Sequence, residues 1–357
     1  MIRGPFFGFT YTDVKSRSKL NQSAETSNSS DVEIQAFSII LRRKIQGKIM
    51  KLIMAAPRGF CAGVERALKI VDEALELLPH PIYVNHEIVH NSHVVEFYKK
   101  KGVIFVEEID DVPDGSSFIF NAHGVPPSLV KASKERGMKI VDATCPLVSK
   151  VHFEAIRYAK QGYKIILIGH EGHPEVIGVM GEAPDAIYLV EKPEDVDDLE
   201  FTQDDKIAYI TQTTLSVDDC AAVISSLKKR YPGVSEPKKA DICYATTNRQ
   251  EAVKQIAEKC DVFLIVGSPN SSNSNRLREV AKAGKGLDAY MVNCAEGLDP
   301  KWFEGKQTLG LSAGASTPEK IVSAVVDRLK AECGLIEVSE FISREENEHF
   351  ALPKIRA

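Results

Sequence analysis

Three stretches of the sequence share one plan: a short apolar segment leads to a cysteine, and a segment with helical spacing follows. The cysteines are Cys61, Cys145 and Cys243. The apolar segments before them, which we expect to be strands, are 52–56, 139–141 and the less apolar 239–242. Apolar residues at i, i+3, i+4 and i+7 after a cysteine indicate an amphipathic helix. The sequence therefore predicts three α/β units that each bring one thiolate to a shared metal centre.

Apolar segments and amphipathic segments alternate along the rest of the chain, which is typical of α/β proteins with parallel sheets. The further strands are expected at 82–84, 103–106, 117–120, 164–168, 186–190, 206–210, 262–266, 289–292 and 307–311. The helices are expected at 63–78, from about 127, and at 147–161, 217–231, 248–259 and up to about 332. Ligands of such proteins bind beyond the carboxyl ends of the strands. We therefore expect three small, mostly parallel sheets that face one central cavity.

The predicted organisation has five parts. They are an extension at 1–49, a first α/β unit at 50–145, a second at 146–242, a third at 243–333 and a C-terminal tail at 334–357. Residues 15–33 are too polar to bury a core, so we expect the extension to be disordered and non-catalytic. An organellar transit peptide is the alternative, because Lys and Arg outnumber Asp and Glu eight to four there. Transit peptides are usually poor in acidic residues, which favours the first interpretation.

The composition excludes several classes of protein. A net charge of −5 shows no basic nucleic-acid surface, and the chain has no run of eighteen apolar residues that could span a membrane. Seven cysteines are an odd set in a chain of this length without a signal peptide, which indicates reduced thiols rather than a disulfide framework. We expect a cytoplasmic (bacterial) protein with no nucleic-acid partner and no membrane span.

The three cysteines fit an iron–sulfur centre better than a structural zinc site. Structural zinc sites usually show paired ligands such as C-x₂-C, and the sequence has none. An iron–sulfur cluster normally takes four protein ligands, so three thiolates would leave one iron of a cubane open to a substrate oxygen. The competing interpretation of any single cysteine is a small buried apolar side chain. We adopt that interpretation for Cys220, Cys260 and Cys333, which lie in amphipathic segments, and Cys294 has no polar cluster around it.

Histidines and hydroxyl groups follow several predicted strands. The histidines lie in the segments NHEIVHNSH (85–93), NAHG (121–124) and GHEGHPE (169–175), and the hydroxyl and amide groups in SSN (271–273) and AGAS (313–316). Such groups, with free backbone N–H groups at helix N-termini, suit a phosphate or diphosphate. The Ser/Asn segment alone is equally typical of a polar turn with a helix cap. The usual nucleotide-binding signatures G-x-x-x-x-G-K-[ST] and G-x-G-x-x-G are absent.

Nine ordered motifs resemble one known family. They are RGFCAGVERA, EIVHN, FNAHGVPP, DATCPLV, GHEGHPEV, TQTTLSVDD, DICYATTNRQ, NSSNSNRL and SAGAS. Together they closely resemble the 4-hydroxy-3-methylbut-2-enyl diphosphate reductase family, the terminal enzymes of the methylerythritol phosphate route to isoprenoids. The resemblance runs from Met50 to about Pro353 and includes the tail motif REEN at 344–347.

The resemblance implies a fold, an activity and a set of site residues. The fold would be three α/β units in a pseudo-threefold arrangement around a central iron–sulfur site. The activity would be reductive dehydroxylation of (E)-4-hydroxy-3-methylbut-2-enyl diphosphate to isopentenyl diphosphate and dimethylallyl diphosphate. The implied ligands of one 4Fe–4S cluster per chain are Cys61, Cys145 and Cys243. The implied proton donor is Glu175, with Thr213 beside it. The implied substrate contacts are His90, His123, His173, Thr213, Ser271, Ser272, Asn273 and Ser316. Reduced ferredoxin or flavodoxin would donate the electrons, to a monomer or homodimer.

Two other function classes remain open at this point. An aconitase-like hydro-lyase also uses an open iron but needs no reductant. A non-enzymatic iron–sulfur sensor that binds a small anion would need an output surface such as a basic recognition helix, and the sequence shows none.

Overall fold

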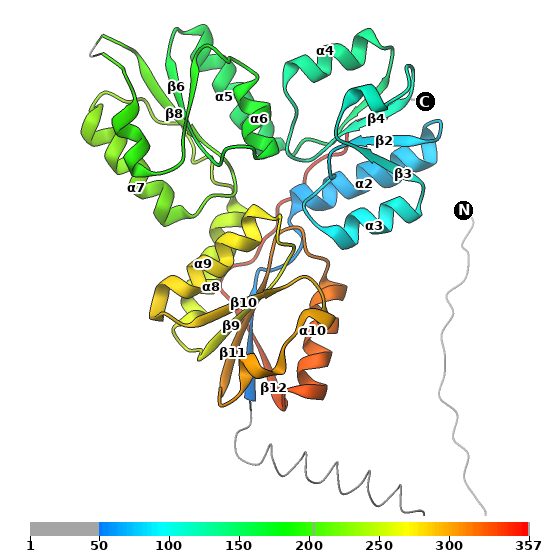
Figure 1. The fold of residues 1–357 in the computed structure, drawn as a ribbon, viewed down its shortest axis with the longest axis vertical. Helices are drawn as coiled ribbons and strands as arrows, with labels where there is room; N and C mark the ends of the chain where they lie inside the picture. Colours follow the sequence, from blue (N-terminus) through cyan, green and yellow to red (C-terminus); the bar gives the residue numbers. More distant parts are fainter. Residues whose placement is uncertain (1–49, 203, 356–357) are drawn as a thin grey trace, which may run out of the picture. The chain divides into compact units, whose positions relative to one another are not determined.

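The structure is a computed structural model that describes residues 50–202 and 204–355. These residues belong to one compact unit. The predicted N-terminal extension, and with it the transit-peptide alternative, lies outside the described residues. The described chain forms three lobes, each built on its own sheet (Figure 1).

All strand pairings in the three sheets are parallel. The first lobe has the order β3-β2-β4-β5, with bounds Val103–Val106, Ile82–Asn85, Ser117–Phe120 and Lys139–Asp142. The second has the order β7-β6-β8, with bounds Ile187–Val190, Lys164–Ile168 and Ile207–Thr211. The third has the order β10-β9-β11-β1-β12, with bounds Asp288–Val292, Val262–Val266, Thr308–Ala313, Met50–Ala56 and Leu335–Ile342.

Helices cover both faces of each sheet, so the central strands are buried on two sides and are continuous apolar segments, whereas the edge strand β12 is mostly exposed. The first lobe carries α2 (Ala62–Leu77) and α3 (Ser92–Lys100) on one face and α4 (Pro127–Glu135) on the other. The second carries α5 (Pro146–Lys160) and α6 (Pro174–Met180) opposite α7 (Val217–Arg230). The third carries α8 (Tyr244–Ala257) and α9 (Ser272–Lys285) opposite α10 (Glu319–Glu332). The predicted α/β fold with small parallel sheets is confirmed.

The first strand does not join the unit that the sequence assigns it to. β1 pairs with β11 and β12 of the third lobe, for example Leu52 with Leu309 and Val338. The boundary predicted at residue 50 is therefore wrong for β1, and the first lobe begins with α2. The reason is that a strand buried on both faces needs partners on both edges, and local sequence does not say which strands provide them. The C-terminal tail provides one of these partners.

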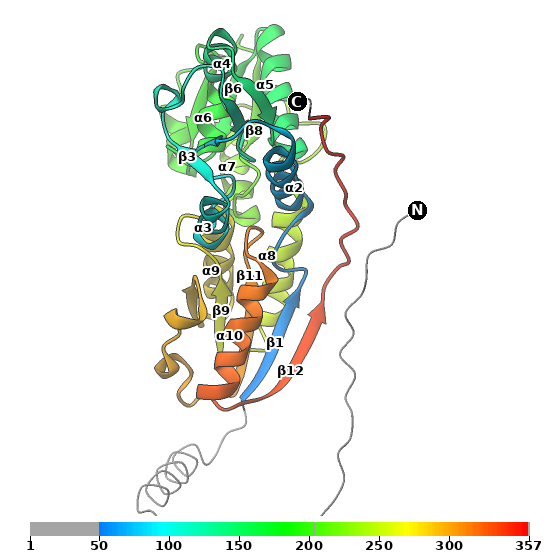
Figure 2. The same cartoon turned by 90° about the vertical axis from the view of Figure 1, so that its right-hand side faces the viewer.

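The segment 239–242, predicted as a strand, is irregular. It contains charged and exposed residues and has no apolar alternation to pack against a sheet, which explains the error. Three α-helices and one strand were not predicted from the sequence: α3, α6, α9 and β12. After β12, the tail runs as extended chain from the third lobe past α2 (Figure 2), where Ile355 packs against the apolar core of the first lobe.

Candidate active site

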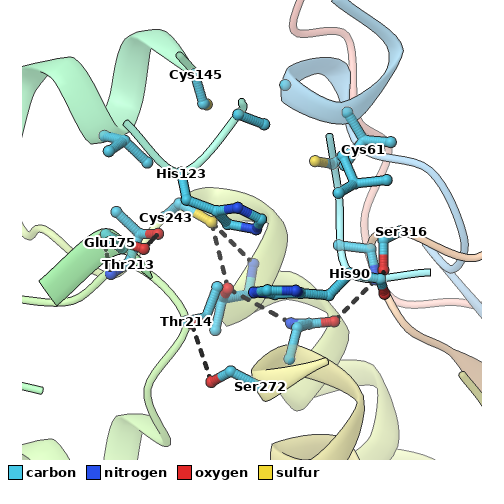
Figure 3. A pocket seen from close by; sticks show the side chains of 18 of the residues that line it. Cys61, His90, His123, Cys145, Glu175, Thr213, Thr214, Cys243, Ser272 and Ser316 are labelled. Carbon is cyan, nitrogen blue, oxygen red and sulfur yellow. Dashed lines mark hydrogen bonds between the residues drawn. The ribbon is translucent and has the colours of Figure 1, made fainter. Parts of the chain in front are cut away.

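One cavity receives side chains from all three lobes. Its lining includes every site residue predicted from the sequence: Cys61, His90, His123, Cys145, His173, Glu175, Thr213, Cys243, Ser271, Ser272, Asn273 and Ser316. These residues follow the carboxyl ends of β1, β2, β4, β5, β6, β8, β9 and β11, or begin the helices after them. In Figure 3, His123 and His90 lie between Cys145 and Ser272. The structure thus brings together loops that are distant in the sequence.

Each of the three cysteines is the N-cap residue of a helix. Cys61 precedes α2, Cys145 precedes α5 and Cys243 precedes α8. The sulfur of Cys243 accepts a hydrogen bond from the backbone N–H of Thr246 at 3.4 Å. Each of the three sulfurs therefore belongs to a residue at a helix N-terminus. The partial positive charge of the helix N-terminus favours the thiolate form.

The cysteine sulfurs lie close enough together to surround a common centre. A Cβ atom placed on Gly63 would lie 2.7 Å from the sulfur of Cys145 and 3.8 Å from that of Cys61, so only glycine fits between them. Burial, and then the neighbouring thiols, raise the pKa of Cys145 to about 12 and that of Cys243 to about 11. Three thiolates this close repel one another unless a cationic centre binds them. The residues therefore fit a metal or iron–sulfur group.

All seven cysteines lie in the described part of the chain, and only these three line the cavity. Cys220 and Cys260 are buried, as predicted, and Cys220 belongs to the core of the second lobe. Cys333 is partly buried against the core of the third lobe, at the end of α10. Cys294 is partly exposed and precedes a short 3-10 helix (Ala295–Gly297).

Three imidazole rings gather in the cavity. His90 and His123 stack with ring centroids 4.1 Å apart, and His173 meets both rings edge-on, at 5.4 and 5.8 Å. Burial, and then the neighbouring rings, lower the pKa of His173 to about 3 and hold that of His123 well below its usual range. The buried Nε2 of His90 has no hydrogen-bond partner among the described residues. A diphosphate could supply the missing hydrogen-bonding partner of this nitrogen.

Hydrogen bonds fix the orientation of these rings. Nδ1 of His123 lies 3.0 Å from Oδ1 of Asn121, and Nδ1 of His173 accepts the backbone N–H of Glu175 at 3.1 Å. Nδ1 of His90 lies 3.4 Å from Oε2 of Glu87, and this contact lowers the pKa of Glu87. Because Nδ1 of His173 accepts a hydrogen bond, its Nε2 is left to donate.

Glu175 forms a closed pair with Thr213. Its Oε1 accepts the backbone N–H of Thr213 at 2.7 Å, and its Oε2 accepts the hydroxyl of Thr213 at 2.9 Å. Glu175 is 1% exposed, and burial raises its pKa to about 7 although both hydrogen bonds act in the opposite direction. A carboxyl group of this kind holds a proton near neutral pH and can donate it to a neighbour.

Hydroxyl and amide groups line the side of the cavity at the N-terminus of α9. Ser271 caps α9 by accepting the backbone N–H of Ser274, so the interpretation as a helix cap is correct as well. Ser272 accepts a hydrogen bond from Thr214 at 3.1 Å, and Ser316 donates to the carbonyl oxygen of His90 at 2.9 Å. Residues from three lobes are therefore connected by hydrogen bonds around a helix N-terminus, which is suited to an anion.

Sequence reasoning missed two hydroxyl residues of the cavity, Thr214 and Thr246. Both stand in the motifs that were singled out, TQTTL and CYATT, directly after or close to a predicted site residue. Their proximity to Thr213 and Cys243 was the available signal. Thr213 and Thr214 both line the cavity, and Thr246 does so from the first turn of α8, a placement that the sequence alone does not reveal.

Comparisons with known proteins identify the family of this chain. The sequence model of the LytB protein family matches residues 52–330. The chain belongs to the LytB family. It is 54% identical over 302 residues to the 4-hydroxy-3-methylbut-2-enyl diphosphate reductase of Chromobacterium violaceum, covering 85% of this chain and 96% of that one. It is 53% identical over 304 residues to the enzyme of the same name from Bordetella pertussis, covering 85% and 93%.

Solved structures of the family share the fold. The E-1-hydroxy-2-methyl-but-2-enyl-4-diphosphate reductase of Plasmodium falciparum superposes with a TM-score of 0.83 and 42% identity, covering 86% of this chain and 96% of that one. An (E)-4-hydroxy-3-methyl-but-2-enyl diphosphate reductase, described as the terminal enzyme of the non-mevalonate pathway, gives 0.57 and 34%, covering 79% and 100%. The predicted family is confirmed, and membership supports the prediction of an iron–sulfur enzyme. Within residues 50–202 and 204–355, no helix has the length and apolar character needed to cross a bilayer.

Proposed function

We propose that the protein is a 4-hydroxy-3-methylbut-2-enyl diphosphate reductase, the last enzyme of the methylerythritol phosphate pathway. It converts (E)-4-hydroxy-3-methylbut-2-enyl diphosphate into isopentenyl diphosphate and dimethylallyl diphosphate. The observation that carries this proposal is the cavity in which three thiols, three imidazoles and one buried carboxyl group from all three lobes face the same space. Family membership agrees with this function.

Cys61, Cys145 and Cys243 would hold one 4Fe–4S cluster. Their fit is supported by the position of Gly63 between two of the sulfurs and by the helix N-termini that favour thiolates. When bound, such a cluster supplies two electrons one at a time and an iron without a protein ligand that acts as a Lewis acid on the substrate hydroxyl.

The diphosphate would bind between the histidines and the N-terminus of α9. The neutral imidazoles donate hydrogen bonds, and the hydroxyl and amide groups of Ser271, Ser272, Asn273 and Ser316 supply further contacts. An anion near the rings also favours their protonation, opposing the low pKa of His123 and His173. The cavity therefore binds the charged end of the substrate without a lysine cluster.

Glu175 would supply the proton for the departing hydroxyl group. The reaction consumes two electrons and two protons: the allylic C–O bond breaks, one proton converts the hydroxide into water, and the other forms the new C–H bond. Protonation at either end of the allylic system gives the two products. Thr213 holds Glu175 in place and is near enough to relay its proton.

The proposal also covers the electron donor, the cellular location and the extent of the catalytic unit. Reduced ferredoxin or flavodoxin would deliver the electrons, because the three thiols of the cavity would be committed to the cluster and cannot be oxidised to a disulfide in each turnover. We place the enzyme in the bacterial cytoplasm, as a monomer or homodimer. The catalytic unit would be residues 50–355, with residues 1–49 as a non-catalytic extension.

Anaerobic purification with Mössbauer spectroscopy tests the proposal. We expect one 4Fe–4S cluster per chain, and one iron site whose parameters change when the allylic diphosphate is added. Turnover should require a one-electron reductant. Turnover without any reductant would instead establish a hydro-lyase, and an iron spectrum that does not respond to the diphosphate would contradict the proposed substrate contact.

A further inference from the structure

Three basic side chains connect the cysteine-bearing loops to one another. They are Arg66 on α2, Lys150 on α5 and Arg249 on α8. Each lies about one and a half helical turns after the cysteine that begins its helix. Each donates hydrogen bonds to the chain segment that leads to the next cysteine, and these three are not among the residues that line the cavity.

Arg66 belongs to the helix that begins at Cys61. Its Nη1 donates a hydrogen bond to the carbonyl oxygen of Thr144 at 3.0 Å, and Thr144 directly precedes Cys145. Its Nε donates to the carbonyl oxygen of Ala351 in the C-terminal tail at 2.9 Å. The guanidinium group therefore connects the helix of one cysteine to the main chain next to another.

Lys150 belongs to the helix that begins at Cys145. Its Nζ lies 2.7 Å from Oδ1 of Asp241, and it also donates to the carbonyl oxygens of the two residues before Asp241. The carboxylate of Asp241 is fully buried, and its other oxygen accepts the backbone N–H of Thr211 at the end of β8. Asp241 stands two residues before Cys243, so Lys150 fixes the approach to that cysteine.

Arg249 belongs to the helix that begins at Cys243. Its Nη2 donates to the carbonyl oxygens of the two residues before Cys61, at 2.9 and 3.4 Å. Its Nη1 contacts both carboxylate oxygens of Glu346 in the tail, at 3.0 and 3.2 Å. Arg249 is 0% exposed. It closes the cycle, because it returns from the third cysteine to the first.

We propose that Arg66, Lys150 and Arg249 are positioning residues that fix the three distances between the cysteine sulfurs. We call them the three clasps. Each restrains one side of the sulfur triangle: Arg66 the side Cys61–Cys145, Lys150 the side Cys145–Cys243, and Arg249 the side Cys243–Cys61. The inference rests on the proposed function, since it assigns the clasps to the site that would hold the cluster.

The physical reason lies in the loops that the clasps contact. Each cysteine follows a segment that has left its sheet or never belonged to one, so its carbonyl groups need donors from elsewhere. Hydrogen bonds from charged donors are stronger than those between neutral groups. Arg249, fully buried and paired with Glu346, restrains its side most firmly. Lys150, with 28% of its side chain exposed, and the partly exposed Arg66 restrain theirs less.

Thiol cross-linking tests the assignment of each clasp to one side. The full-length chain, freed of iron by a chelator under anaerobic conditions, is treated with the short thiol cross-linker dibromobimane, and the linked peptides are mapped by mass spectrometry. In Arg66→Gln we expect the Cys61–Cys145 link to fall roughly tenfold relative to the other two links. Lys150→Gln should reduce Cys145–Cys243, and Arg249→Gln should reduce Cys243–Cys61.

Matched controls come from the same helices. Lys69 on α2 and Lys254 on α8 make ion pairs at the surface, with Glu65 and Asp218, and contact no cysteine segment. Lys69→Gln and Lys254→Gln should leave all three links unchanged. Lys150→Arg should restore the link that Lys150→Gln loses. If all three links fell together in a clasp variant, or none changed, the assignment would be overturned. Because Arg66 and Lys150 are partly exposed, we expect their variants to fold. These two variants test the assignment even if Arg249→Gln does not fold.

A second measurement uses the loaded enzyme. The rate at which an iron chelator removes the cluster should rise roughly tenfold in Arg249→Gln and less in the other two clasp variants. Equal rates in the wild type and in Arg249→Gln would contradict the proposal. A wild-type chain that takes up no cluster would contradict the proposed function. The cross-linking pattern is measured on the iron-free chain, so it tests the three clasps independently of that result.

Discussion

The cysteine cluster (Cys61, Cys145, Cys243) and the histidine cluster (His90, His123, His173) respond to burial in opposite directions. Burial raises the pKa of Cys145 to about 12, because it disfavours the anionic thiolate. Burial lowers the pKa of His173 to about 3, because it disfavours the cationic imidazolium. In both clusters the neighbouring groups of the same kind add to the shift, since a second like charge is repelled.

The difference shows which charge each cluster needs. Three thiolates become stable together only when a cationic centre binds them, and the imidazoles are protonated more readily when an anion approaches. Glu175 is the carboxyl group of the same cavity, and with a pKa of about 7 it holds a proton near neutral pH, where an exposed carboxyl group is ionised. The cavity therefore offers thiols that suit a metal cluster, imidazoles that suit a diphosphate, and an acid that holds a proton near pH 7. If the two clusters act independently, a substitution in one should leave the function of the other unchanged.

The largest effect is expected for Cys145→Ser. Serine is a poor iron ligand, so the protein should lose the brown cluster absorbance and its activity should fall to background. The measurement is the visible spectrum together with iron and sulfide content after anaerobic reconstitution. Cys294→Ser is the control, because Cys294 is also partly exposed but does not line the cavity. An intact spectrum in Cys145→Ser would refute the ligand set.

Glu175→Gln should affect turnover without affecting either cluster of residues. Glutamine keeps the shape and can still accept from Thr213, but it cannot donate the proton, so kcat should fall by roughly 10² to 10⁴. Cluster content and binding of the diphosphate, measured by calorimetry, should remain. Glu171→Gln is the control, since Glu171 lies on the same loop and is exposed. Near-normal turnover of Glu175→Gln would exclude its role as proton donor.

The pH dependence follows from the raised pKa of Glu175. With a pKa of about 7, the acid form is populated below pH 7, so activity should fall tenfold per pH unit above it. Burial, and then the charge of Asp241, raise this pKa, and the hydrogen bonds from Thr213 lower it. In the iron-free chain, Glu175 of the folded state keeps its proton up to about pH 7, whereas the same residue in the unfolded chain loses it above pH 4.5. Stability should therefore fall as the pH rises from about 4.5 to 7, then level off. Urea unfolding at several pH values measures this slope, and Glu175→Gln should lack it.

Much of the site could be predicted from the sequence because it consists of strand-end loops. In parallel sheets the carboxyl ends of the strands lie at one edge, so polar residues after predicted strands were good candidates. All twelve predicted site residues line the cavity, among them Glu175 and Ser316, which are far apart in the chain. The family motifs supplied their roles, since strand position alone does not distinguish a proton donor from a helix cap.

Long-range pairing could not be predicted in the same way. The sequence of β1 shows that it is buried, but not that its partners are β11 and β12 from the other end of the chain. The role of Arg249 was equally hidden, because its main acceptors are backbone carbonyls almost two hundred residues away. A residue of any type presents a backbone carbonyl oxygen, so no sequence motif identifies these acceptors.

The smallest effect is expected for His123→Gln, which tests directly whether the two clusters are separate. Glutamine can still donate one hydrogen bond but cannot take up a proton from the surroundings of the diphosphate, so KM should rise roughly fivefold. The cluster absorbance and iron content should stay at wild-type values, because His123 contacts Asn121 and the other rings rather than a cysteine helix. His80→Gln is the control, since His80 is exposed and contacts only the carbonyl of Leu75. Loss of iron from His123→Gln would show that metal binding by the cysteines depends on the histidines. The opposite charge requirements of the two clusters could then not be treated separately.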